Sequence, residues 1–298
     1  MNITISGASG LIGRRLLKVL AGDGHQLHVL SRHAGTNLPA GVKLSSWDAA
    51  RGEPPADSLR DADAVIHLAG EPVAQRWNAA VKQKIASSRI DSTRNLVAAL
   101  GKLEKRPQVL VCASAIGYYG SRGDELLTED SAPGSDFLAD VCVKWEKAAR
   151  EAESLGVRVV SVRTGVVLDA RGGALAKMLP AFRMGGGGPL AGGRQWMSWI
   201  HIADLAAIFR HALLNPVSGP VNGVAPNAVT NAEFTRALGA AVKRPAIFPV
   251  PALALKLMFG EMSEVLLASQ RVLPKATEAA GFRFQFTELS AALTDLLK

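Results

Sequence analysis

A glycine-rich loop near the start of the chain has the spacing of a dinucleotide-binding turn. Gly7, Gly10 and Gly13 follow the β-branched run Asn2–Ser6 and open a segment with helical spacing over residues 11–20. Such glycines permit a tight turn and a close approach to a diphosphate, while the unpaired N–H groups of the helix attract its charge. A plain strand-to-helix turn is the alternative, but the position between a strand and a helix favours a bound dinucleotide.

The end of the second predicted strand indicates which dinucleotide this is. Proteins that use NAD usually place an acid there to hold the ribose 2′-hydroxyl. Between Asp23 and Asp48 the chain has no acidic residue, and the strand 27–30 leads instead to Arg32 and His33. A guanidinium grips a 2′-phosphate with paired hydrogen bonds, whereas a carboxylate would repel it. We therefore predict NADP(H) rather than NAD(H), with Arg32 as the main phosphate ligand; a solvated surface arginine is the alternative.

Strand-like and helix-like segments alternate through the first half of the chain. Strands are predicted over 2–6, 27–30, 42–47, 64–68, 109–114 and 157–164, and helices over 11–20, 78–100 and 137–154. This order implies right-handed crossovers and a parallel sheet covered on both faces. The predicted fold class is α/β, a Rossmann-type doubly wound parallel sheet with a smaller, mostly helical C-terminal substrate lobe.

The pattern changes after Gly165, where paired glycines mark loops around one short helix. Residues 199–202 look extended and lead into a further helix, and Thr230 with Glu233 forms a capping-box pattern that predicts a helix start. Prolines become frequent from Pro245 onward. We predict a Rossmann domain over 1–244, with 166–200 contributing to the substrate lobe, and a small helical domain over 245–298.

Composition narrows the range of partners. The 298 residues are 48% hydrophobic and carry a formal charge of +8, but the basic residues are scattered and form no arm for nucleic acid. The two cysteines form no disulfide framework or metal-binding spacing. No signal-peptide pattern or apolar stretch of about 20 residues is visible. We expect a cytoplasmic monomer or homodimer with a small-molecule substrate and no metal, nucleic-acid or membrane partner.

Several motifs resemble those of the short-chain dehydrogenase/reductase superfamily in its extended, epimerase/dehydratase form. They are SGASGLIG (6–13), VIHLAG (65–70), CASAIGYYG (112–120), VRTGVVL (162–168) and WIHIADLA (199–206). Longer strings resemble an atypical branch labelled "epimerase family protein", whose tail is a domain of unknown function. They are HLAGEPV (67–73), SRIDSTRNL (88–96), GGRQWMSWIH (192–201) and QRVLPKATEAAGF (270–282).

The resemblance implies where a cofactor is held. Contacts are expected from the glycine loop, from the ends of the next strands and beside the adenine, and the segment after Thr164 is expected to line the nicotinamide. The predicted cofactor-binding residues are Gly7, Ser9, Gly10, Leu11, Ile12, Gly13, Arg32, His33, Asp48, Leu68, Ala69, Gly70 and Thr164.

The chain departs from this superfamily where its chemistry is done. The usual catalytic pair is a Tyr, which moves the proton, and a Lys four residues later, with a Ser on the preceding strand. Ser114 matches the Ser, but counting back from Glu146 places Leu138 at the Tyr position and Cys142 at the Lys position. A leucine cannot move a proton, so the usual route for hydride transfer is absent. Arg89 is another departure, since it stands where extended members commonly have Asn.

Other side chains are candidates to replace the missing pair. Tyr118 and Tyr119, the chain's two tyrosines, lie just past Ser114. We predict Ser114, Tyr118 and Tyr119 as the catalytic set; packing with one hydroxyl hydrogen bond is the alternative for the tyrosines, and a strand-end hydroxyl bonded to backbone is the alternative for Ser114. For Cys142, a buried thiol is favoured over a nucleophile.

A second set of polar residues is predicted to line a substrate pocket for an anionic or polyol ligand. The set is Arg163, Arg194, Gln195 and His201. Arg194 could instead be a flexible loop charge, and His201 a structural group.

Two functions remain open from the sequence. The first is an NADP(H)-dependent oxidoreductase or epimerase-like enzyme that acts on a small carbonyl or sugar-like substrate with a nonstandard proton relay. The alternative is a catalytically silent NADP(H)-binding redox sensor or partner scaffold. DNA binding driven by the positive charge is less favoured.

Overall fold

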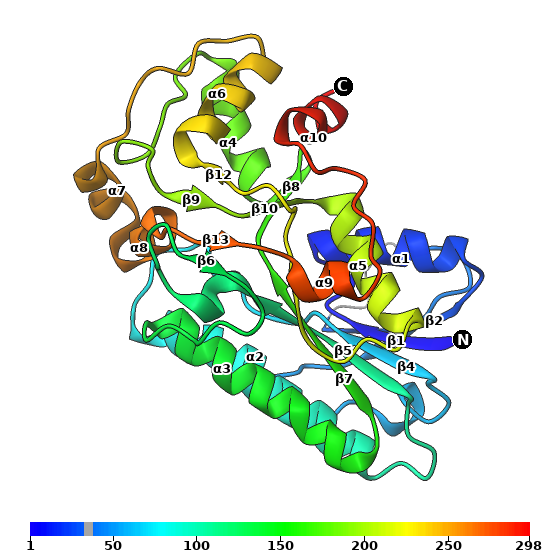
Figure 1. Ribbon diagram of the computed structural model, residues 1–298. Helices are drawn as coiled ribbons and strands as arrows, with labels where there is room; N and C mark the ends of the chain where they lie inside the picture. Colours follow the sequence, from blue (N-terminus) through cyan, green and yellow to red (C-terminus); the bar gives the residue numbers. More distant parts are fainter. Residues whose placement is uncertain (33–37) are drawn as a thin grey trace.

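A seven-stranded parallel sheet forms the centre of the computed structural model, which describes residues 1–32 and 38–298 (Figure 1). In spatial order the strands are β11 (Gly219–Gly223), β7 (Arg158–Thr164), β5 (Val109–Ala115), β4 (Ala64–His67), β1 (Asn2–Ser6), β2 (Gln26–Ser31) and β3 (Lys43–Ser46). Every neighbouring pair is parallel. The strand order reverses between β1 and β4, which opens a crevice at their carboxyl ends.

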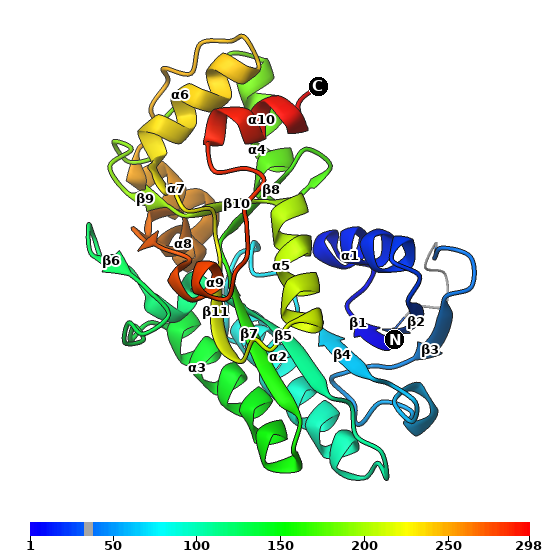
Figure 2. The same cartoon turned by 45° about the vertical axis from the view of Figure 1, so that its right-hand side comes forward.

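Helices cover both faces of the sheet, as the sequence predicts. Helices α1 (Leu11–Gly22) and α5 (Ile202–Leu214) lie on one face, and α2 (Ala79–Gly101) and α3 (Phe137–Arg150) on the other (Figures 1 and 2). Helix α3 ends four residues before the predicted boundary, and its chain continues as the 3₁₀ helix Glu151–Leu155. The doubly wound α/β fold is therefore confirmed.

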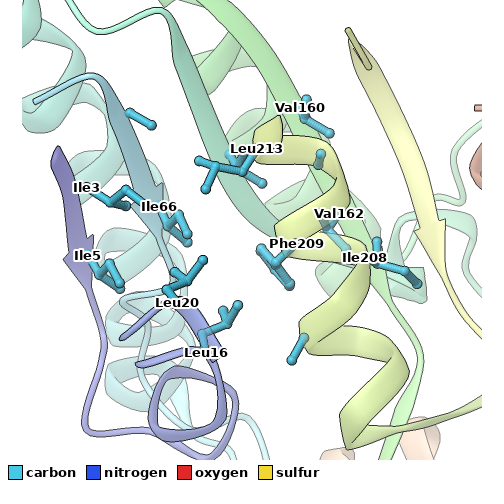
Figure 3. Close-up of a cluster of buried hydrophobic side chains, with 14 of the residues drawn as sticks. Ile3, Ile5, Leu16, Leu20, Ile66, Val160, Val162, Ile208, Phe209 and Leu213 are labelled. Carbon is cyan, nitrogen blue, oxygen red and sulfur yellow. The ribbon is translucent and has the colours of Figure 1, made fainter. Parts of the chain in front are cut away.

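Alternating strand residues supply the two halves of the core. Figure 3 shows the half beneath α1 and α5, where β-branched side chains of β1, β4 and β7 meet Leu16, Leu20 and Phe209. Ile5, Ile66, Leu16 and Phe209 are all 0% exposed. Each such side chain contributes about 1.5–3 kcal/mol when it is removed from water. This packing holds the sheet edge, and hence the crevice, in one geometry.

A smaller lobe packs beyond the carboxyl ends of the strands. Helices α4 (Gly173–Arg183), α6 (Asn231–Ala241) and α10 (Leu289–Leu296) surround the buried Trp199 and Phe234. The predicted capping box is present: Thr230 Oγ1 accepts from the N–H of Glu233, whose carboxylate accepts from the N–H of Thr230 at 2.7 Å. This pairing satisfies the first N–H groups of α6.

Short elements complete the chain. The strands are β6 (Leu126–Leu127), β8 (Val166–Asp169), β9 (Trp196–Met197), β10 (Trp199–His201), β12 (Val229–Thr230) and β13 (Arg271–Val272). The helices are α7 (Ala252–Phe259), α8 (Ser263–Leu267) and α9 (Lys275–Ala279), with 3₁₀ turns at Ala56–Ser58, Ile116–Tyr119 and Gly260–Met262. Among the described residues, no helix has the length and apolar character needed to cross a bilayer.

The last part of the chain returns across the whole molecule (orange to red in Figure 1). Strand β13 pairs with β6, α9 packs against β11, and α10 packs against α6. The carboxylate of Asp204, at the start of α5, accepts hydrogen bonds at 2.9 Å from the backbone N–H groups of Gln285 and Phe286. The C-terminal segment therefore contacts both the Rossmann sheet and the smaller lobe.

Candidate functional site

The glycine loop fits so tightly on its neighbours that side chains are excluded from it. Gly7 has φ +71°, and a β-carbon there would lie 2.6 Å from the carbonyl carbon of Leu68. A β-carbon on Gly13 would lie 2.5 Å from the Cα of Ala8. Gly10 is the N-cap of α1 and provides no side-chain cap for the helix. The loop thus has the close backbone approach and uncapped helix N-terminus that a diphosphate requires.

A cavity of about 210 Å³ opens beside this loop, at the ends of β1, β2 and β4. Arg32 and Asp48 both line it, together with Trp47 and the predicted residues Ser9, Leu68, Ala69 and Gly70. Asp48 pairs with Arg51 at 3.1 Å. His33 lies outside the described residues. The structure thus gathers the residues predicted for the adenosine end of the cofactor around one cavity.

A larger cavity of about 670 Å³ continues from the same strand ends. Ser114, Thr164, Leu138 and Cys142 line it, and it shares Leu68, Ala69 and Gly70 with the first cavity. A third cavity of about 530 Å³, beneath the smaller lobe, includes Leu11 and Ile12. Adjacent cavities that share these residues therefore form a crevice along the strand ends, with Arg32 in the first cavity and Ser114 in the largest.

Ser114 is held by a buried ion pair. Its Oγ donates to Glu146 Oε1 at 2.6 Å, and both carboxylate oxygens of Glu146 accept from Arg163 at 2.9 Å. Glu146 and Arg163 are 5% and 3% exposed. Burial opposes the charge of Arg163, but the hydrogen bonds and charge of Glu146 outweigh it and raise the pKa of the guanidinium above its ordinary value. A carboxylate in a bidentate pair only accepts, so the Ser114 proton points at Glu146.

The two tyrosines contact this ion pair, Tyr119 from the protein interior and Tyr118 from a partly buried position. Tyr119 is 0% exposed; its hydroxyl donates to Asn222 at 2.7 Å and accepts from Arg163 at 3.0 Å. Burial raises the pKa of Tyr119 to about 12. The ring of Tyr118 lies 3.5 Å from the Arg163 guanidinium carbon. Neither tyrosine is among the described residues that line these three cavities.

The predicted substrate-pocket residues are dispersed. Arg163 is enclosed by its ion pair, and Arg194 is exposed in a glycine loop. Gln195 donates to the carbonyl of Leu190 at 3.2 Å. His201 is buried, accepts from the N–H of Ala203 at 3.1 Å and stacks on a phenyl ring. Burial lowers the pKa of His201. None of these four described side chains lines the crevice.

Two further residues line the crevice: Gln270, for which the sequence predicted no role, and Cys142, for which the sequence favoured a buried thiol. Gln270, from the C-terminal segment, lines both larger cavities and donates to the carbonyls of Ile116 at 2.9 Å and Gly120 at 3.0 Å. Cys142 is 4% exposed, and burial raises the pKa of its thiol to about 12, so it is a poor nucleophile at neutral pH. The family-like string beginning at Gln270 was a signal, but nothing local showed that it reaches the crevice.

The fold and the crevice define a Rossmann-type protein with a crevice at the strand reversal, which is where proteins of this fold bind dinucleotides. The model of the NAD dependent epimerase/dehydratase family matches residues 3–225, and that of a domain of unknown function, DUF1731, matches residues 250–296. The chain belongs to the NAD dependent epimerase/dehydratase family. The predicted superfamily resemblance is confirmed.

Similar proteins carry the name "epimerase family protein". The chain is 43% identical over 294 residues to Mb2239 of Mycobacterium bovis, covering 98% of this chain and 96% of the relative. It is 40% identical to the chloroplastic SDR39U1 homolog of Arabidopsis thaliana, covering 100% and 87%. The crystal structure of human SDR39U1 (isoform 2) with NADPH is 38% identical with a TM-score of 0.89, covering 100% and 99%.

Proposed function

We propose that this chain is an NADP(H)-dependent oxidoreductase or epimerase-like enzyme that acts on a small carbonyl or sugar-like substrate without a Tyr–Lys pair. The observation that carries the proposal is the pair of adjacent cavities along the strand ends, one lined by Arg32 and the glycine loop and the other by Ser114. The NADPH in the structure of the human relative agrees with the cofactor expected from Arg32.

The crevice residues fit this cofactor in three places. The uncapped N-terminus of α1 would hold the diphosphate, and Arg32 would hold the 2′-phosphate. Thr164, at the end of β7, lines the larger cavity on the predicted nicotinamide side. When bound, NADP(H) supplies the hydride exchange of such enzymes.

Ser114 determines the polarity of the group beside it. Because the hydroxyl proton of Ser114 is engaged in the hydrogen bond to Glu146, the oxygen of Ser114 can only accept a hydrogen bond from a substrate. A hydroxyl satisfies this requirement, whereas a carbonyl oxygen would need Ser114 to leave Glu146. The hydrogen-bond pattern therefore supports a substrate bound as an alcohol or sugar hydroxyl, with Glu146 and Arg163 as positioning residues.

The second candidate is an NADP(H)-binding protein that does not turn over. It is favoured by the side chains of Leu138 and Cys142, which line the cavity where the superfamily pattern has Tyr and Lys. Neither can exchange a proton readily: leucine has no titratable group, and burial raises the pKa of the Cys142 thiol.

The two candidates are separated by one experiment. Purified protein is mixed with NADPH and a carbonyl panel, and with NADP⁺ and an alcohol and polyol panel, while NADPH absorbance and cofactor retention are followed. We expect turnover with at least one compound and, in Ser114→Ala, a loss of about fivefold or more, since one hydrogen bond is worth about 1 kcal/mol or more. The exposed Ser154→Ala is the control. Tight retention without turnover in either panel supports the silent protein, and full activity in Ser114→Ala removes its assigned role.

A further inference from the structure

The 530 Å³ cavity has walls from two parts of the molecule. One side is the glycine loop with Leu68 and Ala113, where we expect the cofactor. The opposite side comes from the smaller lobe and the C-terminal segment. It consists of Ala174 and Met178 on α4, Trp196 and Met197 on β9, and Met262, Val265 and Leu266 in and just before α8. This second side is left for a substrate when a dinucleotide occupies the first.

No charged side chain is among the described residues that line this cavity. Arg89 lines the neighbouring cavity instead, and a β-carbon on Gly70 would lie 3.2 Å from its guanidinium carbon. Gly70 follows β4 at the cofactor's end of the sheet, so this cation stands on the cofactor's side. A nucleoside diphosphate sugar in the 530 Å³ cavity would therefore bury its phosphates without a cation beside them, which is strongly unfavourable.

Four side chains with polar groups line the cavity, and each is engaged within the protein. The indole N–H of Trp196 donates to Asp124 at 2.7 Å. The hydroxyl of Ser198 donates to the carbonyl of Gln270 at 2.8 Å, and the amide of Gln270 donates to two backbone carbonyls at 2.9 and 3.0 Å. Asn231 accepts from a backbone N–H at 2.7 Å and donates to a methionine sulfur at 3.2 Å. A sugar would leave most of its hydroxyls without partners here.

Methionines make up much of the apolar wall. Three of the six in the chain line the cavity, namely Met178, Met197 and Met262. Methionine has an unbranched, polarizable side chain that packs against apolar groups of varied shape. Met178 and Met197 are only partly buried, so a bound apolar molecule would cover the rest of their surface. Such a wall favours an alkyl or aryl group over a polyol.

We propose that the 530 Å³ cavity binds the apolar body of an uncharged alcohol, whose single hydroxyl donates to Ser114 in the adjoining cavity. The two cavities share Ala113, Ile116 and Val166, so one molecule can extend from one into the other. The inference rests on the proposed function in taking Ser114 as the group that meets the hydroxyl. It narrows the substrate class from sugar-like compounds to alkyl or aryl alcohols.

The test measures the binding of two ligand series to the NADP⁺-loaded protein by calorimetry and tryptophan fluorescence. The first series is 2-butanol, 2-hexanol and 2-octanol, and the second is glucose, sorbitol and UDP-glucose. We expect the affinity of the alcohols to rise about fourfold with each added methylene, because each leaves water for an apolar wall. Every member of the second series should bind at least about tenfold more weakly than 2-octanol, because its polar groups would be buried without partners.

A polar change in the methionine wall tests where the chain of the alcohol lies. Met178→Gln, which places an amide of similar size there, should weaken the binding of 2-octanol about fivefold or more, because the amide has no partner in an apolar wall. Met184→Gln is the matched control, since it makes the same change at the 81% exposed C-cap of the same helix. Ala174→Phe, which fills part of the cavity, should weaken 2-octanol more than 2-butanol and covers the case in which Met178→Gln does not fold.

Binding needs no turnover, so this test can fail separately from the enzyme assay. Failure of the alcohols to bind, an affinity that does not change with chain length, or equal effects of Met178→Gln and Met184→Gln would each overturn the inference. Tighter binding of UDP-glucose or a sugar than of 2-octanol would also overturn it. A rise of affinity with chain length in a protein without turnover upholds the apolar site and refutes the enzyme. Turnover of a sugar without binding of the alcohols refutes the apolar site and leaves the enzyme.

Discussion

Arg163 shows how one side chain can hold several others in place. It binds Glu146 with two hydrogen bonds, donates to Tyr119 and lies on the ring of Tyr118. A buried ion pair is costly to desolvate, and its value lies more in fixing geometry than in stability. Here that geometry directs the proton of Ser114 away from the cavity. The sequence predicted Arg163 and the tyrosines as groups that meet the substrate; our proposed site instead leaves them in the supporting interior.

We propose that the choice of cofactor depends on Arg32, which lines the cavity beside the glycine loop. We expect Arg32→Ala to weaken NADPH binding about tenfold to a hundredfold and to leave NADH binding nearly unchanged, because a charge-assisted hydrogen bond is worth about 1.5–3 kcal/mol. Fluorescence titration of both cofactors measures the change. Arg60→Ala, which removes an exposed charge elsewhere, should alter neither affinity. Equal affinities for NADPH and NADH in the unmodified protein would contradict the assignment.

His67 makes the stability of the fold depend on pH. It is 0% exposed on β4, its Nδ1 lies 2.6 Å from Ser6 Oγ, and burial lowers its pKa from 6.5 to about 4. Below pH 6.5 the unfolded chain takes up a proton that the folded protein refuses until about pH 4, so stability falls as the pH falls through this window. Between about pH 7 and about pH 5 we expect a loss of about 2 kcal/mol.

The measurement is the difference in unfolding free energy between the protein and His67→Gln, taken at both pH values by urea denaturation. Other titrating groups cancel in this difference. It should shift in favour of the variant by the stated amount on acidification, and an unchanged difference would show that His67 does not titrate as inferred.

Elements with a simple repeating pattern were predicted well from the sequence. Short apolar and β-branched runs predicted β1, β4, β5 and β7, and helical spacing predicted α1, α2 and α3, with their boundaries within a few residues. Strand β11 was missed because Gly219, Pro220 and Gly223 look like a loop. It forms because parallel pairing with β7 satisfies its backbone, which is a tertiary contact that local sequence does not show.

The residues of the candidate site also fall into those that the sequence could predict and those that it could not. Gly7, Gly10 and Gly13 are predictable because strand, loop and helix are consecutive in the chain. Arg89 and Gln270 are not, because they reach the cavity from segments far apart in sequence. Tyr118 and Tyr119 come four and five residues after Ser114, yet the 3₁₀ turn Ile116–Tyr119 buries Tyr119 and leaves Tyr118 partly buried beside it.

The close packing of α1 on the glycine loop can be tested by comparing alanine substitutions at two glycines of this helix, Gly13 and Gly22. A β-carbon on Gly13 would meet the backbone of Ala8 at 2.5 Å, whereas one on Gly22, in the same helix, would meet nothing within 4 Å. We expect Gly13→Ala to destabilise the fold by about 1–3 kcal/mol and to weaken NADPH binding at least about tenfold. Gly22→Ala should stabilise by about 0.5–1 kcal/mol and leave binding unchanged. Thermal unfolding and NADPH titration test both; similar effects from the two changes would refute the close fit.

At the scale of the whole molecule, residues 245–298 remain our proposed C-terminal unit, and the match of the domain of unknown function to 250–296 supports that boundary. The unit does not stand apart. Strand β13 extends β6, Asp204 binds the backbone before α10, and α10 completes the core around Phe234. We infer that the segment unfolds together with the rest of the chain.

This inference predicts a single calorimetric transition, with van't Hoff and calorimetric enthalpies in agreement. Leu293→Ala, at a 0% exposed position on α10, should lower the free energy of unfolding of the whole chain by about 2–5 kcal/mol. The protein should still unfold in one transition. Leu253→Ala, at a 68% exposed position, should change stability by less than about 0.5 kcal/mol. NADPH at about a hundred times its Kd should add about 2.7 kcal/mol. A separate early transition in Leu293→Ala would show an independent unit.

Gln270 ties the carbonyls of Ile116 and Gly120 to the end of the chain. During synthesis the glycine loop leaves the ribosome first and the sheet can begin to assemble, but the wall that Gln270 completes arrives last. The growing chain therefore has a phosphate-binding turn long before it has a closed chamber for the rest of the ligand. We therefore expect a bound dinucleotide to be enclosed on the Gln270 side only after residue 270 has been synthesised and has folded into place.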